Sequence, residues 1–312
     1  SVTYTDKGRY DMNRLILVLI IFVIAVAAPL AAEDLFVEYV EGYVDVRRGS
    51  SWQELYIGDS VSETDTVKVD DNSLAEFSGA SRTFTLTKPG TYEIRSLLTA
   101  SRRKEQSGVG TLLSGKMQSM FAPTGDSGPS TVGGVRASEA VNEEDEFMWV
   151  ESDVQELITS GKELLEQEEY DEALELFEEA YDYALDLEEE YASLFYQGYT
   201  QAILGRPGAA MDAIADIDPA PEADYYYDYY LLRGKLLIDS FAFEEAAEFL
   251  TSFDEIYATP EQKQTLYLLT GYSYLEAEMS DRAKEYLQDA VTIDPDSDTG
   301  KTASELFEQI ST

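Results

Sequence analysis

The spacing of hydrophobic residues changes along the chain, and its first part has a period of two. Over residues 35–94, hydrophobic residues such as Val44 and Val46 are separated by single polar residues. This alternation is typical of strands with one buried face. Turn signals such as the Pro-Gly pair in residues 88–90 separate the short runs. The pattern predicts an all-β domain, a sandwich or barrel, over residues 33–147. The other alternating pairs are Val67 and Val69, Phe84 and Leu86, and Tyr92 and Ile94.

The second part of the chain has the period of helices and repeats itself. Four glycines, at positions 161, 198, 234 and 271, are spaced by 37, 36 and 37 residues. A period in this range is typical of stacked repeats, each of which is one supersecondary unit. We expect four helix–turn–helix repeats over residues 151–298 and a capping helix over residues 299–312. Around each glycine the same residues recur: Leu157, Leu194, Tyr230 and Tyr267 four positions before, Ala173, Ala210, Ala246 and Ala283 twelve after, and Phe177, Ile214, Leu250 and Leu287 sixteen after.

This frame resembles the tetratricopeptide repeat (TPR) family, and the resemblance covers about half of the chain. The first unit matches at Leu157, Gly161, Tyr170, Ala173, Phe177 and Ala180, and the fourth at Tyr267, Gly271, Tyr274, Ala283, Leu287, Ala290 and Pro295. The resemblance implies an all-α helical-hairpin solenoid whose first helices line a concave groove. It also implies that this groove binds a protein or peptide partner. The groove positions are Lys162, Leu165, Phe195, Tyr199, Leu231, Lys235, Leu268 and Tyr272, although several of them could simply pack against neighbouring helices.

Residues 35–140 resemble the FecR-like domain of bacterial envelope proteins. The matching residues are Gly42–Val46, Trp52–Leu55, Gly58-Asp59, Asp65–Val67, Ser73–Phe77, Phe84–Leu86 and Thr131–Ser138. In the last segment, Ala137 and Ser138 stand where the family has Gly and Thr. Well-known members regulate sigma factors through a cytoplasmic segment, but at most 14 residues precede the apolar run here. The resemblance therefore implies an exported β module that binds or scaffolds.

The N-terminal region predicts export. Met12-Asn13-Arg14 is followed by an apolar run over residues 15–30 and then by Ala31-Ala32. A short positive start, an apolar stretch and small residues are typical of a secretory signal peptide. We therefore expect residues 1–32 to be an N-terminal extension and signal peptide, with Met12 as the start, and a periplasmic or otherwise exported protein. The alternative is an uncleaved inner-membrane anchor, because the run is nearly long enough to span a bilayer.

Charge and composition exclude several classes of function. The net charge is −40, and residues 151–312 contain 40 acidic residues against 8 basic ones. Such a surface disfavours nucleic acid and anionic lipid, which require clustered cations. The chain has no cysteine and no histidine. It therefore lacks a thiol nucleophile, a histidine base and the ligands of a Cys/His zinc site. We expect no enzymatic activity, no cofactor and no metal site.

Two segments have spacings close to known ligand-binding loops. Residues 110–116 read G-x-x-x-x-G-K, but Met117 stands where a phosphate-binding loop needs a hydroxyl. We interpret them as a turn before a strand over residues 117–121, and we interpret residues 99–110 and 122–134 as loops. Asp294, Asp296, Asp298 and Glu305 have EF-hand-like calcium spacing, but the glycine comes one position late. A helix end there, with Asp298 or Thr299 capping the next helix, is the simpler interpretation.

Two further clusters are interpreted as structural. The aromatic run over residues 225–230 could form a binding platform, but its helical spacing favours packing in the core and between repeats. The acid runs over residues 166–169 and 188–190 are expected to be solvated, because no apolar pocket surrounds them to shift their pKa values.

Three functions remain open. The first is a non-enzymatic exported scaffold, in which the groove holds a partner and the β domain docks to an envelope component. The second is a cell-wall glycan-binding protein that acts through the β domain, with Tyr43, Trp52 and Tyr56 as stacking residues. The third is a membrane-anchored envelope signalling regulator, which requires the apolar run to be retained.

Overall fold

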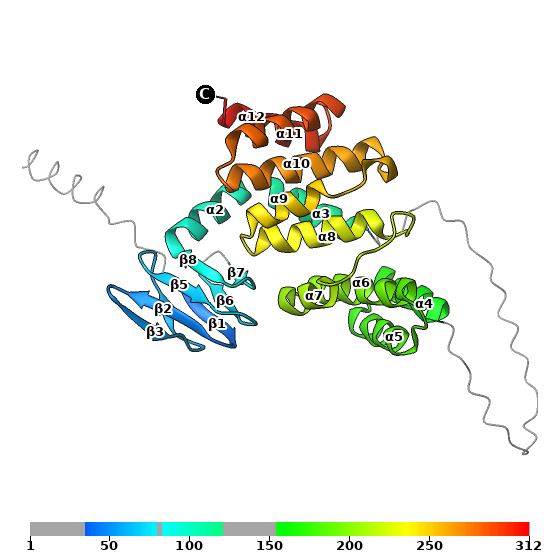
Figure 1. The fold of residues 1–312 in the computed structure, drawn as a ribbon, viewed down its shortest axis with the longest axis horizontal. Helices are drawn as coiled ribbons and strands as arrows, with labels where there is room; N and C mark the ends of the chain where they lie inside the picture. The colour runs from blue at the N-terminus through cyan, green and yellow to red at the C-terminus, as the bar shows by residue number, and fades with distance from the viewer. Residues whose placement is uncertain (1–34, 80–82, 121–153, 312) are drawn as a thin grey trace, which may run out of the picture.

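The computed structural model describes residues 35–79, 83–120 and 154–311, and its first part is built from two small antiparallel sheets (Figure 1). We call residues 35–93 the β module. The strand order is β4-β1-β6-β7 in one sheet and β3-β2-β5-β8 in the other. The strands are β1 (Leu35–Glu41), β2 (Val44–Arg48), β3 (Ser51–Glu54), β4 (Ser60–Val61), β5 (Thr66–Val69), β6 (Leu74–Ser78), β7 (Thr83–Leu86) and β8 (Gly90–Glu93).

The alternation seen in the sequence builds the core of the β module. Val44 pairs with Val69 and Val46 pairs with Val67 across β2 and β5, and all four side chains are buried. Residues from both sheets share one buried cluster, which also contains Phe84 from β7. Because side chains on a strand alternate between its two faces, one register places every second residue in the core.

The segment after β8 differs from the sequence prediction. Residues 99–110 were predicted to be a loop, and a strand was expected to begin at Met117. Instead, all of residues 99–110 except Ser107 and Gly108 lie in two helices, α2 (Ile94–Gln106) and α3 (Val109–Ser119), and Met117 lies in α3. The buried residues of α3 are Val109, Leu113 and Met117, which recur every four residues and form one helical face. The glycine content of this segment obscured that period. Gly110 and Gly115 lie inside α3, so the G-x-x-x-x-G-K stretch does not form a phosphate-binding loop.

Residues 154–311, which we call the array, form four helical hairpins and a final helix. The hairpins are α4 (Val154–Glu166) with α5 (Tyr170–Tyr183), α6 (Leu187–Ile203) with α7 (Pro207–Ile214), α8 (Tyr226–Asp239) with α9 (Phe243–Thr251), and α10 (Pro260–Glu276) with α11 (Ser280–Ile293); α12 (Asp298–Gln309) follows, and the short helix η1 (Glu255–Tyr257) precedes α10. The order of the helices is that of four helix–turn–helix units and a final helix. The N-cap of α12 is Ser297, whose hydroxyl accepts from the Gly300 N–H at 2.9 Å, and not the predicted Asp298 or Thr299.

The frame glycines mark one packing contact that recurs in every hairpin. A Cβ atom placed on Gly161 would lie 2.4 Å from Phe177, sixteen residues later. The same construction at the other three glycines meets Ile214, Leu250 and Leu287 at 2.4, 2.7 and 2.7 Å. Only glycine lets the two helices of a hairpin approach this closely. The two residues that stand sixteen positions apart in each repeat are therefore in contact between the two helices of the hairpin.

The turn inside each hairpin has a left-handed residue at an equivalent place. These residues are Glu168, Gly205, Phe241 and Glu278, with φ between 61° and 73°. Phe241 is the largest of them, and a left-handed conformation is unusual for so bulky a side chain. Its ring meets Phe84 of the β module edge-on at 5.6 Å and packs against the core of that module. The turn of the third hairpin is thus an anchor between the two parts of the chain.

The α2–α3 segment, residues 94–119, connects the β module to the array. Figure 1 shows α2 leaving the β module and α3 lying behind α8, so a segment that precedes the array in sequence packs against its middle. A direct ion pair of 2.9 Å also joins Lys88 to Glu245 of α9. Among the described residues, no helix is both long and apolar enough to cross a bilayer. The predicted signal segment, and the predicted loop over residues 122–134, lie outside the described residues.

Candidate interaction surfaces

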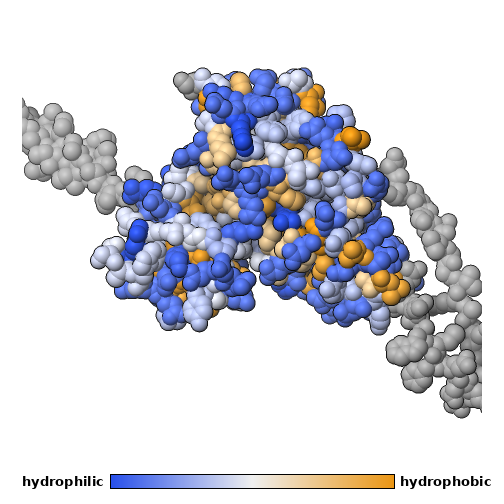
Figure 2. Space-filling view, in the orientation of Figure 1, coloured by the Kyte–Doolittle hydropathy of each residue, from blue (hydrophilic) through white to orange (hydrophobic). Residues whose placement is uncertain are grey.

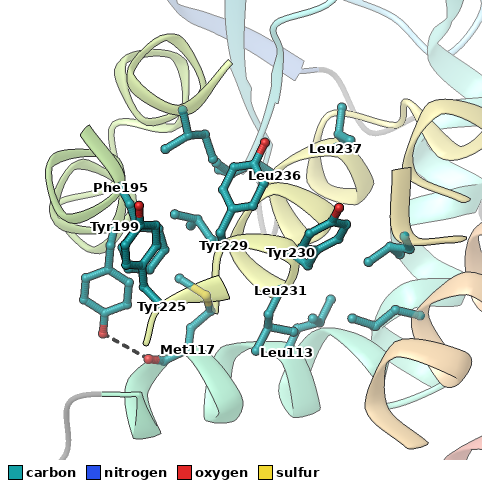
Figure 3. Close-up of a cluster of buried hydrophobic side chains, with 14 of the residues drawn as sticks. Leu113, Met117, Phe195, Tyr199, Tyr225, Tyr229, Tyr230, Leu231, Leu236 and Leu237 are labelled. Atoms are coloured by element: carbon teal, nitrogen blue, oxygen red, sulfur yellow. Dashed lines mark hydrogen bonds between the residues drawn. The ribbon is translucent and has the colours of Figure 1, made fainter. Parts of the chain in front are cut away.

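The inner side of the array is covered by a helix of the same chain. Leu113 and Met117 of α3 are buried in one cluster with Phe195 of α6 and Leu231 of α8 (Figure 3). Figure 3 shows both α3 side chains pointing up from that helix toward the first helices of the second and third hairpins. The array therefore already binds a polypeptide segment, and that segment is α3.

A buried hydrogen bond fixes the end of α3. The Tyr199 hydroxyl donates to the main-chain carbonyl of Met117 at 3.0 Å (Figure 3). Carbonyls in the last turn of a helix have no partner within the helix, so a side chain from outside must satisfy them when water is excluded. Because Tyr199 comes from α6, this bond ties the end of α3 to the second hairpin.

Opposite charges join the α2–α3 segment to the array. The segment carries Arg95, Arg102, Arg103, Lys104 and Lys116 against the single acid Glu105, whereas the array is strongly acidic. Lys104 pairs with Asp239 at 2.8 Å, Arg103 with Glu276 at 3.1 Å and Lys116 with Glu261 at 2.5 Å. The three acids lie on α8 and α10, so the basic segment pairs with carboxylates of two neighbouring helices. Complementary charge of this kind selects partners and orients them.

The surroundings shift the pKa values of two of these acids in opposite directions. Burial alone would raise the pKa of Asp239, but Lys235 and Lys104 outweigh it and lower that pKa below its ordinary value. For Glu276, burial raises the pKa in spite of the nearby Arg103 guanidinium. Its Oε2 accepts from Arg103, while Oε1 is buried without a hydrogen-bond partner. Asp239 is therefore the stronger electrostatic anchor for α2.

The eight predicted groove residues fall into two groups. The apolar and aromatic ones are buried, and the two lysines are paired within the array. Lys162 binds Asp224 at 3.0 Å and lies 5.1 Å from the centre of the Tyr196 ring, and Lys235 binds Asp239. Binding of a separate partner by these residues stays a prediction. The buried ones are Leu165, Phe195, Tyr199, Leu231, Leu268 and Tyr272.

Asp228, an acid near Lys162, has an unusually high pKa. Burial, assisted by the nearby Asp224 carboxylate and opposed by Lys162, raises the pKa of Asp228 to about 6. Asp228 lies in the first turn of α8. Its charge therefore changes within the mildly acidic range, where ordinary carboxylates stay ionised.

The predicted glycan-stacking residues lie on one face of the β2–β3 hairpin. Arg47 is paired with Trp52, and the guanidinium carbon lies 5.4 Å from the centre of the indole ring. The Leu55 N–H donates to the Val44 carbonyl at 2.8 Å, so the ladder continues and sets Tyr43 opposite Tyr56. Cross-strand partners share one face of a sheet. All three aromatic side chains are exposed, by 71% for Tyr43, 43% for Trp52 and 60% for Tyr56.

A wide opening lies beside α3, at the last hairpin. It is a cavity of about 1060 Å³ between one side of α3, the start of α10 and the turn from α11 to α12. Leu112, Pro260 and Ile293 supply apolar surface, and Glu261, Asp294 and Asp298 supply carboxylates. Its remaining walls are glycine, serine and threonine for the most part.

The other segments singled out in the sequence have structural roles. Asp294 accepts from the Asp296 and Ser297 N–H groups, which shapes a turn, and no group of acids in the described part of the chain has the geometry of a metal site. The aromatic run is mostly buried, with the Tyr225 ring stacked on Phe195 at 4.8 Å. The acid run over residues 166–169 is exposed. The α2–α3 contact was missed, although the spacing of Val109, Leu113 and Met117 and the local excess of cations indicated it.

Comparisons with known proteins give a limited result. Neither protein families nor curated proteins yield a match to this chain. Among solved structures, the MamA RS-1 ArsTM double mutant is similar at 21% identity and a TM-score of 0.39, over 51% of this chain and 92% of that one. A thermophilic TPR protein in Thermus thermophilus is similar at 20% identity and a TM-score of 0.35, over 50% of this chain and 82% of that one. At these values, neither similarity says anything about function.

Proposed function

We propose that this chain is a non-enzymatic exported scaffold whose array binds a protein partner and whose β module docks to an envelope component. The observation that carries the proposal is the α3 contact. The array holds a polypeptide segment by burying Leu113 and Met117, by the Tyr199 hydrogen bond and by ion pairs. A surface that binds one peptide segment in this way has the features needed to bind another.

The arrangement of the two parts supports a scaffold. Phe241 packs against Phe84 and Lys88 pairs with Glu245, so the β module has a fixed place on the array. A partner on the array and a component on the β module would then be held at a set separation. The resemblance of the β module to FecR-like domains and the N-terminal apolar run support the envelope location.

Hydrogen exchange on the intact protein tests this proposal. The purified chain is used to capture proteins from envelope extract, and each captured protein is purified and added back. The proposal predicts slower exchange in the array when the partner is bound. Slower exchange confined to the β module would contradict an array-based scaffold.

A second function is favoured by the exposed aromatic face of the β2–β3 hairpin. Tyr43, Trp52 and Tyr56 share that face with Arg47 and Glu54, a mixture that suits stacking and hydrogen bonding to sugar rings. A glycan-binding protein of this kind should sediment with purified cell wall. Trp52→Ala should abolish sedimentation, whereas Tyr181→Ala, at an exposed tyrosine of the array, should not.

The anchored regulator remains a third proposal and depends on the N-terminus alone. Mass spectrometry of the mature protein decides it. A mature chain that begins near Glu33 excludes retention of the apolar run, and a chain that still contains residues 15–30 supports an anchor.

A further inference from the structure

The cavity beside α3 is built from both the α2–α3 segment and the array. Gly115, Thr111 and Leu112 form one wall, and the start of α10 with the α11–α12 turn forms the other. Lys116 crosses the rim to Glu261 at 2.5 Å. Neither part makes this cavity alone, so docking of α3 on the array creates it. Figure 2 shows a visible surface that is hydrophilic over most of its area, with apolar residues in smaller patches.

The chemistry of the cavity is that of a peptide site. Leu112, Pro260 and Ile293 provide apolar contact surface, while Gly108 and Gly115 have no side chain that would keep a main chain away. The volume of about 1060 Å³ exceeds what a single side chain fills. One of its walls is α3, the polypeptide that already lies on the array.

The charges around the cavity favour a positively charged occupant. Three carboxylates, Glu261, Asp294 and Asp298, line it against the single cation Lys116. The side chains of Glu261 and Asp298 are exposed to solvent; Glu261 is paired with Lys116 at 2.5 Å, and Asp298 lies 3.9 Å from Lys301, which leaves an excess of one carboxylate. A partner segment with lysine or arginine would therefore be attracted, and an acidic one repelled. The α2–α3 segment shows the same preference, because its Lys116 pairs with Glu261 of this cavity.

We propose that this composite cavity is the partner site of the scaffold and that it takes a short segment of a partner protein with alternating aliphatic and basic side chains. The inference rests on the proposed function, because it names the place and the chemistry of the partner. Burial of the aliphatic side chains against Leu112, Pro260 and Ile293 supplies affinity, and the carboxylates supply selectivity.

Gly115 allows a direct test, because a Cβ atom placed there meets nothing within 4 Å. Because Gly115 lines the cavity, Gly115→Leu would place an aliphatic side chain where the partner segment is expected to lie. Ser114→Leu is the matched control, since Ser114 is the adjacent exposed residue of α3 and does not line the cavity. Gly115→Ala separates the effect of helix propensity from the effect of filling the cavity.

The probes are two fluorescein-labelled hexapeptides, one alternating Leu and Lys and the other alternating Leu and Glu, measured by fluorescence anisotropy with the full chain. We expect the Leu-Lys peptide to bind the wild type, Ser114→Leu and Gly115→Ala alike. Binding to Gly115→Leu should be weaker by about tenfold or more, which corresponds to about 1.4 kcal/mol. Equal binding to Gly115→Leu, no binding to the wild type, or equal binding of the Leu-Glu peptide would overturn the inference.

A second pair of variants tests the charge. Asp298→Lys reverses a carboxylate at the cavity in the first turn of α12, and Asp281→Lys does the same in the first turn of α11, away from it. Only Asp298→Lys should weaken binding of the Leu-Lys peptide, by severalfold, and equal effects would count against the site. Failure of the scaffold proposal has a separate readout, namely partner protection confined to the β module. That result is independent of the peptide assay.

Discussion

The hydroxyl of Tyr199 on α6 donates to the carbonyl of Met117 at the end of α3, over 3.0 Å. The two residues are 82 positions apart in sequence. Both are buried, so the carbonyl has no access to water as a substitute partner. This bond, with the burial of Leu113 and Met117, holds the α2–α3 segment on the array.

Removing that hydroxyl should loosen α3 in particular. Tyr199→Phe leaves the Met117 carbonyl buried without a donor, which costs about 1–3 kcal/mol. We expect the amides of α3 to exchange faster with deuterium while those of α10 and α11 change little. Tyr181→Phe, which alters an exposed tyrosine, is the control and should have no effect. A uniform loss of protection across the chain would contradict a local role for the bond.

The raised pKa of Asp228 predicts an unusual dependence of stability on pH. The folded protein holds this proton up to a pKa of about 6, whereas an unfolded aspartate releases it near about 3.9. In that window the folded state binds more protons, so the free energy of unfolding falls as pH rises. Asp228→Asn should remove this loss and make the protein more stable at neutral pH, by about 1–3 kcal/mol. Urea titrations at pH 4, 5, 6 and 7 measure it, and an unchanged slope would refute it.

The same substitution should have opposite effects at two helical glycines. Gly115→Ala should stabilise the protein by about 1 kcal/mol, because alanine favours a helix and nothing occupies the space. Gly161→Ala should destabilise it, because the new methyl would lie 2.4 Å from Phe177, and overpacking costs about 1–3 kcal/mol. Urea midpoints of the two variants compare them directly. Stabilisation by Gly161→Ala would mean that the first hairpin is packed less closely than described.

The left-handed turn residues predict a route to greater stability. Glu168→Gly and Glu278→Gly should each stabilise the array by about 0.5–1 kcal/mol, because glycine adopts positive φ without a steric penalty. Gly205→Ala should have the opposite effect. Thermal unfolding measures all three variants. Phe241→Gly is a distinct case, because it relieves the backbone but removes the ring that packs on Phe84, so it should free the β module from the array.

The sequence predicts the helical hairpins of the array because the repeated residues are the ones that touch within each hairpin. Gly161 and Phe177 touch, as do Gly271 and Leu287, so the spacing of sixteen reports the packing directly. In the β module, alternation at Val44 and Val46 indicates burial for the same reason. Neither pattern depends on contacts between distant segments.

The candidate sites could not be predicted as well, because they depend on a contact between distant segments. In α3, the four-residue spacing of Val109, Leu113 and Met117 was hidden among Gly110 and Gly115, which favour loops when considered locally. That these residues cover Phe195 and Leu231 follows only from the folded arrangement. The inner side of the array was therefore expected to be open, whereas α3 packs there against Phe195 of α6 and Leu231 of α8.

The most direct test of the account is a zero-length cross-link between α3 and the array in the native protein. A carbodiimide joins a lysine to a carboxylate only when the two are in contact, and mass spectrometry of the monomeric product identifies the joined residues. The account predicts links from Lys116 to Glu261 and from Lys104 to Asp239, alongside the Lys162–Asp224 link within the array as an internal control. Recovery of the Lys162–Asp224 link without either of the other two would show that the α2–α3 segment does not lie on the array.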